Sequence, residues 1–174
     1  MARLTVPFIL LFVALQGCGR PSGGGETSEA TTAETTGGDV CEEPTALSSC
    51  PDASVDYCAC SEGRRCPTDE SWHQIWAGLN CTECHSDNGT TPEAGLSLDV
   101  EDARLNLVNF NSNGPNQMAR VVPGQPAESY LWHKIRLAHT CVDGAMGDGM
   151  PPNSVLTIEQ LREIATWICC GANI

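Results

Sequence analysis

Two cysteines and a histidine stand close together near the middle of the chain, in the stretch NCTECHS at residues 80–86. Cys81 and Cys84 are about one helical turn apart, and the imidazole of His85 follows the second thiol directly. Two thiols at this separation can form thioether bonds to the two vinyl groups of a haem, while the adjacent histidine binds the iron. The pattern therefore predicts one covalent haem c per chain, held by Cys81, Cys84 and His85.

Three other uses of these residues compete with haem. Zinc would take two thiolates and an imidazole, but a structural zinc site needs a fourth ligand, which only Cys141 or Cys169 would supply. A redox-active dithiol usually stands at the start of a helix, whereas this motif follows a predicted helix. The third alternative is a plain disulfide beside an unrelated histidine.

A candidate for the other side of the iron lies in the stretch GDGMPP at residues 147–152. The thioether of Met150 is a soft, uncharged ligand that favours ferrous iron and raises the reduction potential relative to a second histidine. Two prolines stiffen this loop, so the sulfur loses little entropy on binding. We predict His85 and Met150 as the axial ligands of the haem iron. Other candidates are Met146, the main alternative distal ligand, and Met118, His133 and His139.

Four segments with helical signals must position these side chains, and no segment alternates as a strand would. The first begins at the cap Thr68 and is expected to run directly into Cys81. The second spans residues 99–110, and the third opens at Pro126 and continues through residue 135. The last begins with the capping box of Thr157 and Gln160 and stops at residue 171. The apolar core is thin, which is typical of a helical shell around a non-protein group.

The first 40 residues are predicted to lie outside the folded domain. Residues 1–17 combine an early arginine, an apolar run and small residues, as a secretory signal does. Leu15-Gln16-Gly17-Cys18 resembles the lipobox of bacterial lipoproteins, so Cys18 is expected to be lipidated and to anchor the protein to a membrane. Residues 18–40 are small and polar and form a flexible tether. The formal net charge of −13 argues against nucleic acid as a partner.

The chain has eleven cysteines, and after an export signal this density indicates disulfides. With Cys18 assigned to lipid and the central pair to haem, eight candidate disulfide cysteines remain: Cys41, Cys50, Cys58, Cys60, Cys66, Cys141, Cys169 and Cys170. Five of them precede the central motif and three follow it, so complete pairing requires at least one bridge between the two groups. Such a bridge would close a loop of roughly 100 residues, worth about 4 kcal/mol. The adjacent Cys169 and Cys170 are expected to take separate partners.

The segment from about residue 76 to 174 resembles the class I-like cytochrome c domains of the planctomycete and myxobacterial type. The shared motifs stand here, in order, at 81–85 (CTECH), 95–99 (GLSLD), 121–129 (VVPGQPAES), 150–152 (MPP) and 167–172 (WICCGA). The resemblance implies His85 as proximal and Met150 as distal ligand, and contact between the first and last helices. It implies an all-α, cytochrome c-like fold over residues 68–174, with three to four helices and long loops around one haem. The Cys-rich block at residues 41–67 is not part of the family pattern. We expect it to form a disulfide-rich N-terminal extension.

These observations predict an exported c-type cytochrome that transfers one electron at a time to or from a redox protein partner. It would be lipid-anchored in the bacterial cell envelope, in the periplasm or at the outer membrane. No constellation for acid–base or nucleophilic catalysis is present, so we expect an electron carrier rather than an enzyme. A haem peroxidase-like enzyme, a haem-based sensor and a metal-free, disulfide-rich surface lipoprotein are the alternatives.

Overall fold

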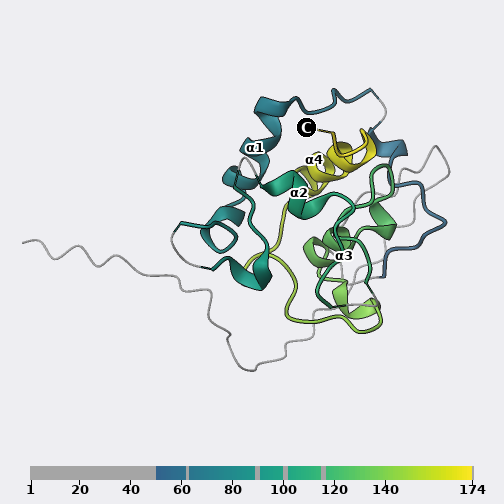
Figure 1. Cartoon of the computed structure of the whole chain (residues 1–174). Coiled ribbons are helices and arrows are strands. Elements are labelled where there is room, and N and C mark those ends of the chain that lie inside the picture. The colour runs from purple at the N-terminus through teal and green to yellow at the C-terminus, as the bar shows by residue number, and fades with distance from the viewer. Residues whose placement is uncertain (1–49, 62, 89–90, 100–101, 115–116, 174) are drawn as a thin grey trace, which may run out of the picture.

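The computed structural model describes residues 50–61, 63–88, 91–99, 102–114 and 117–173. Within these residues the chain forms four α-helices: α1 (Asp69–Gly78), α2 (Ala103–Leu107), α3 (Tyr130–Ile135) and α4 (Ile158–Cys169). Short 3-10 turns lie before and between them: η1 (Ala59–Ser61), η2 (Cys81–Glu83), η3 (Glu93–Gly95), η4 (Pro126–Glu128) and η5 (His139–Cys141). The only β-structure in the described part is two isolated bridges, so the predicted all-α class is confirmed. Figure 1 shows these elements along the chain.

The predicted signal sequence, the lipidated Cys18, the tether and Cys41 all fall in residues 1–49, outside the described residues. In the part that the structure describes, no helix combines the length and the apolar character needed to cross a bilayer.

The last helix forms as its sequence predicts. Thr157 accepts a hydrogen bond from the backbone N–H of Gln160 at 3.3 Å, and the Gln160 side chain accepts one from the N–H of Thr157 at 2.8 Å. This reciprocal pair caps the first turn. The helix ends before Gly171, whose φ of +90° suits glycine. The apolar stripe is buried from Leu161 onward, whereas Ile158 at the start of the helix is 41% exposed.

The first helix is capped as predicted but ends earlier. The side chain of Ser71 accepts a hydrogen bond from the N–H of Thr68 at 2.8 Å. The helix does not run directly into Cys81, because Asn80 adopts a left-handed conformation with φ of 57° and separates α1 from η2. The two terminal helices do pack together, since the rings of Trp76 and Trp167 meet edge to face at 5.6 Å.

The two middle helices are shorter than predicted. The second covers only Ala103–Leu107, because Val108 turns extended and pairs with Val121. The third is broken at Ser129, which is extended, so η4 and α3 are separate elements. The buried hydroxyl of Ser129 accepts from the N–H of Val122 at 2.9 Å and donates to the carbonyl of Gln125 at 2.9 Å. A side chain that satisfies the backbone in this way replaces the helical bonds that a continuous helix would make.

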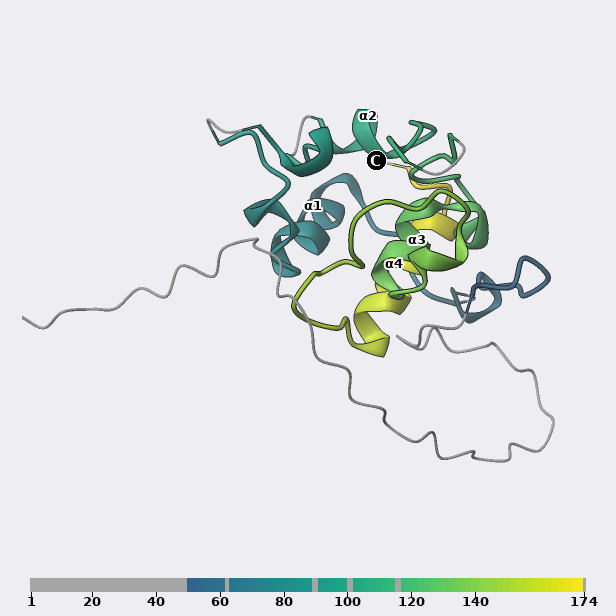
Figure 2. The ribbon, with the colours of Figure 1, turned by 90° about the horizontal axis from the view of Figure 1, so that it is seen from below.

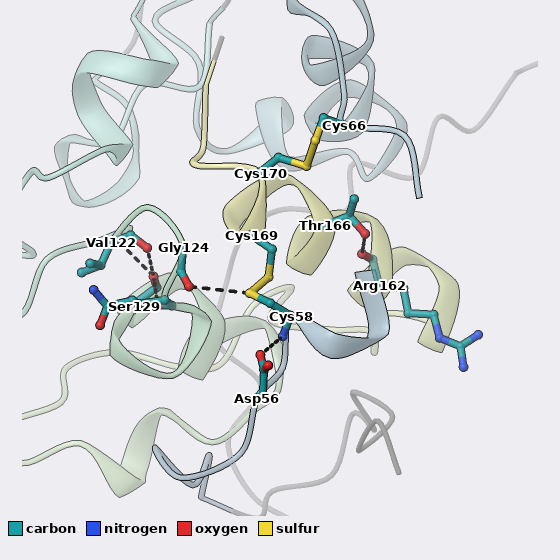
Figure 3. Close-up of a disulfide and its surroundings, with 11 residues drawn as sticks. Asp56, Cys58, Cys66, Val122, Gly124, Ser129, Arg162, Thr166, Cys169 and Cys170 are labelled. Carbon is teal, nitrogen blue, oxygen red and sulfur yellow. Dashed lines mark hydrogen bonds between the residues drawn. A yellow bond between two sulfur atoms is a disulfide. The ribbon is translucent and has the colours of Figure 1, made fainter. Parts of the chain in front are cut away.

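Three disulfides fasten the Cys-rich extension to the C-terminal part of the chain. They join Cys50 to Cys141, Cys58 to Cys169 and Cys66 to Cys170. The prediction that at least one bridge connects the two groups is therefore confirmed, as is the separate pairing of Cys169 and Cys170, which Figure 3 shows at the end of α4. The side chain of Cys60 is outside the described part.

The extension also contributes to the core. Tyr57 is buried, its ring lies 5.7 Å from that of Trp132, and its hydroxyl accepts a hydrogen bond from Arg136 at 3.2 Å. The guanidinium of Arg136 is almost completely buried and lies 5.3 Å from the centre of the Tyr57 ring. The extension is thus packed against the helices. Between α3 and α4 the chain makes a long excursion without a helix after η5, which Figure 2 shows in green to yellow.

Candidate functional site

Cys81 opens η2 immediately after the left-handed Asn80. Its side chain is half-buried, packs against the hydrophobic core and carries a free thiol. Burial raises the pKa of this thiol to about 11, so the sulfur is protonated at neutral pH.

The imidazole of His85 is anchored by a backbone carbonyl further along the chain. Its Nδ1 lies 3.2 Å from the carbonyl oxygen of Leu96, and the carbonyl of His85 accepts a hydrogen bond from the N–H of Leu98 at 2.7 Å. A proton on Nδ1 satisfies this carbonyl and leaves the lone pair of Nε2 for a metal. Burial lowers the pKa of His85, which favours the neutral imidazole that a metal needs.

Asp99 ties together the two segments that hold this histidine. One carboxylate oxygen accepts a hydrogen bond from the hydroxyl of Ser86 at 2.6 Å, and the other accepts one from the N–H of Asp87 at 2.7 Å. Ser97 adds a third donor at 3.2 Å. These bonds lower the pKa of Asp99, that of Ser86 most. The segment at 95–99 was noted in the sequence only as a shared motif, and its role is to brace the residues around His85.

The structure differs from expectation at Cys84. Its sulfur is disulfide-bonded, to a partner whose side chain is outside the described part of the chain. We expected Cys81 and Cys84 to act as one pair, but here Cys81 keeps a free thiol. Sequence spacing does not reveal such a pairing, because a disulfide depends on which sulfurs meet in space. Two thioether bonds can form only after this disulfide is opened.

The two methionines in the loop before α4 have different environments. The side chain of Met150 is half-buried and packs against the hydrophobic core cluster, which also includes Cys81 at its edge. Met146 is 63% exposed, and its side chain covers Gly114 in a surface loop. A buried sulfur next to the core suits an axial ligand better than an exposed one. This contrast favours Met150 over Met146.

The remaining candidates for the distal position are less suited to it. Nε2 of His133 on α3 lies 2.9 Å from the carbonyl oxygen of Ala127 in the preceding turn η4. His139 lies at the start of η5 and lines a cavity of about 390 Å³ formed by residues 139–145 and 147. Met118 is half-buried in the loop that precedes η4. Of the three candidate methionines, only Met150 packs against the hydrophobic core cluster that Cys81 also contacts.

A second cavity, of about 250 Å³, is lined by residues 53–58 and 124–128, between the extension and η4. Neither cavity is lined by the residues of the predicted site. Within the described ranges, no three histidine, cysteine or carboxylate side chains are grouped so that they would hold a metal ion.

Comparison with known proteins gives one family match, which covers the central motif and the methionine loop. A family model described as Planctomycete cytochrome C matches residues 81–154, which begin at Cys81 and include His85, Met146 and Met150. The match supports a planctomycete-type cytochrome c domain at residues 81–154. The match covers less than half of the 174-residue chain and leaves α1, α4 and the Cys-rich extension outside it. No curated protein and no solved structure matches the chain.

The match to this cytochrome c family suggests, at a coarse level, haem-based electron transfer. Proteins of this kind bind haem and generally carry electrons rather than catalyse reactions. The predicted resemblance is therefore confirmed for the segment that contains the central motif and both loop methionines. The helices α1 and α4 lie on either side of the matched segment and contact each other through Trp76 and Trp167.

Proposed function

We propose that this protein is a monohaem c-type cytochrome of the bacterial cell envelope, with thioether bonds at Cys81 and Cys84 and with His85 and Met150 as axial ligands. The fold proposed for residues 68–174 is cytochrome c-like. The observation that carries the proposal is the imidazole of His85, which is held through Nδ1 by the carbonyl of Leu96, inside a segment that matches a cytochrome c family.

The residues present fit a haem in three respects. The tautomer of His85 favoured by Leu96 leaves Nε2 available to the iron. The free thiol of Cys81 lies against the apolar core, an environment that favours burial of an apolar porphyrin ring. Met150 contributes a half-buried thioether to the same cluster. The Cys84 disulfide must be reduced by a thiol reductant before its sulfur can form a thioether, since one sulfur cannot make both bonds.

When bound, haem supplies the one-electron couple of its iron. The residues of the chain set the conditions for this couple. Leu96 orients His85, and Asp99 holds the turn that follows His85 through Ser86 and Asp87. Met150 contributes an uncharged sulfur donor, which raises the reduction potential relative to a second histidine. Burial of these groups excludes water and further tunes the potential.

The proposal extends to location and partners. The lipobox-like stretch at residues 15–18 supports a lipid anchor on Cys18, followed by the tether at 18–40, at the periplasmic or outer membrane face. The three disulfides of the described part support an oxidising compartment. The electron would be exchanged with a redox protein partner rather than with a small substrate bound in a catalytic pocket.

The first test is a reduced alkaline pyridine spectrum of the protein produced in a strain with haem-attachment machinery. A covalent haem that stays with the polypeptide after acid–acetone extraction is the expected result. A Cys81→Ala/Cys84→Ala variant serves as the control, because it keeps His85 and Met150 but has no thiol for attachment. A wild-type spectrum identical to that of the control would contradict the proposal.

A further inference from the structure

The loop that carries both candidate methionines is fastened to α3 through its backbone. Tyr130 and Lys134 stand four residues apart on this helix and therefore face the same side. The ammonium of Lys134 donates hydrogen bonds to the carbonyl oxygens of Met146 at 2.6 Å and of Asp148 at 2.7 Å. The hydroxyl of Tyr130 accepts a hydrogen bond from the N–H of Met146 at 3.3 Å.

The main chain of Lys134 holds the other end of the same loop. Its carbonyl oxygen accepts a hydrogen bond from the N–H of Met150 at 2.9 Å. One residue therefore binds residues 146, 148 and 150, with its side chain at the first two and its backbone at the third. Two of the three bonds are charge-assisted, which makes them stronger than bonds between neutral groups.

Close packing leaves this loop little freedom next to Met150. Gly149 is buried, and a Cβ atom at its position would lie 2.5 Å from Cδ2 and 3.3 Å from Cα of Leu137, just after α3. A larger residue here would displace the Leu137 side chain and crowd its backbone. The residue that precedes Met150 is thus pressed against the end of the helix that carries Lys134.

Lys134 is the only lysine of the chain, and its half-buried side chain donates hydrogen bonds to two main-chain carbonyls of the loop. Its target atoms are main-chain carbonyls, so the contact fixes the path of the loop rather than the identity of its side chains. It also lies 5.3 Å from the centre of the Tyr130 ring, a cation–π distance.

We propose that Lys134 is the positioning residue for the distal ligand: it holds the 146–150 loop against α3 so that Met150 is presented to the iron in one place. This inference rests on the proposed ligation by Met150. A preorganised ligand binds more tightly, because less freedom is lost when the bond to the metal forms. Loss of the clamp should therefore make Met150 easier to displace by an external ligand.

The test is the affinity of the ferric protein for imidazole, which competes with Met150 for the iron. Lys134→Met keeps the length and apolar part of the side chain and removes both charge-assisted bonds, so we expect imidazole to bind roughly tenfold more tightly or better. Lys134→Arg keeps the charge and should give an intermediate affinity. Arg104→Met is the matched control, since it removes one positive charge from an exposed position on α2 and should leave the affinity unchanged.

Hydrogen exchange of peptides covering 146–150 gives a second readout that does not depend on electron transfer. Exchange should be faster in Lys134→Met than in the wild type and in Arg104→Met. Unchanged imidazole affinity and unchanged exchange in Lys134→Met, in a protein whose wild type shows the methionine–iron absorption band, would overturn the positioning role alone. A wild type without that band would instead overturn the proposed ligation, and the role of Lys134 with it.

Discussion

Hydrogen bonds from residues outside the CTECH motif hold both the ring of His85 and the turn that follows it. Its ring is held by Leu96, and the turn that follows it is held by the carboxylate of Asp99 through Ser86 and Asp87. If His85 binds the haem iron as proposed, these bonds would keep its ring orientation when the iron changes oxidation state. The carboxylate of Asp99 is therefore the best place to test how the site is supported.

Asp99→Asn should lower the stability of the fold near neutral pH. Both carboxylate oxygens of Asp99 accept hydrogen bonds, and the NH₂ group of asparagine would replace one acceptor by a donor. The hydrogen bonds from Ser86 and Asp87 lower the pKa of Asp99 in the folded state. Its contribution is therefore present above the unfolded pKa of about 3.9 and is lost as the pH falls through the lower folded value. Urea denaturation between about pH 3 and pH 7 should show a gap between wild type and variant that closes toward acid.

Asp102→Asn is the control for this series, since Asp102 is exposed and precedes α2. It makes the same chemical change without touching the segment around His85. A gap between the wild type and Asp99→Asn that stayed constant down to about pH 3 would show that the carboxylate is not held as described.

Met150 and Met146 allow a direct comparison of two ligands in one loop. Met150→Ala should abolish the long-wavelength charge-transfer band of the oxidised protein and lower its reduction potential, because the thioether donor is lost. Met146→Ala should keep the band, since this side chain is 63% exposed and lies over Gly114. Loss of the band in Met146→Ala but not in Met150→Ala would identify Met146 as the distal ligand instead.

The sequence showed which side chains could bind haem. It did not show which residues position those side chains. Cys81, Cys84, His85 and Met150 were apparent from type and spacing. Leu96 acts through a backbone carbonyl and Lys134 acts on backbone carbonyls, so neither leaves a pattern in the sequence. The disulfide at Cys84 was not apparent either, because it depends on the path of the whole chain.

The helices with the most sequence signals, such as caps and an apolar stripe, were predicted best. The last helix has a capping box, an apolar stripe and a terminating glycine, and it forms where expected. The second and third helices lack such agreement, and tertiary bonds shorten both of them: Val108 pairs with Val121, and the side chain of Ser129 bonds to the loop before η4. Propensity is a weak prior that packing overrides in short segments.

The end of α4 is fixed by two neighbouring disulfides, and this arrangement has a measurable consequence. The bonds Cys58–Cys169 and Cys66–Cys170 span 111 and 104 residues, so either one alone closes nearly the same loop. Replacing one pair by alanines should cost less than the roughly 4 to 5 kcal/mol expected for an isolated loop of this length.

Replacing both pairs should cost clearly more than the sum of the two single-pair changes, because only then is the closure at α4 lost. Urea denaturation of the two double variants and of the quadruple variant measures this coupling. Strictly additive losses would mean that the two bonds constrain the unfolded chain independently.

For the whole molecule, cysteine parity predicted that the extension is joined to the C-terminal part, but not which sulfurs meet. The three disulfides whose two cysteines are both described run between the two groups, and Tyr57 adds a buried contact to Trp132 and Arg136. The residues outside the family match thus enclose the cytochrome c segment from both ends of the chain.

The most direct measurement is the mass of the mature, non-reduced protein, followed by peptide mapping. We predict that the mass exceeds that of polypeptide and lipid by one tetrapyrrole, carried on a peptide that contains both Cys81 and Cys84. We also predict peptides joined through Cys50–Cys141, Cys58–Cys169 and Cys66–Cys170. A mature protein without the added tetrapyrrole, and with Cys84 still in a disulfide, would contradict the proposal.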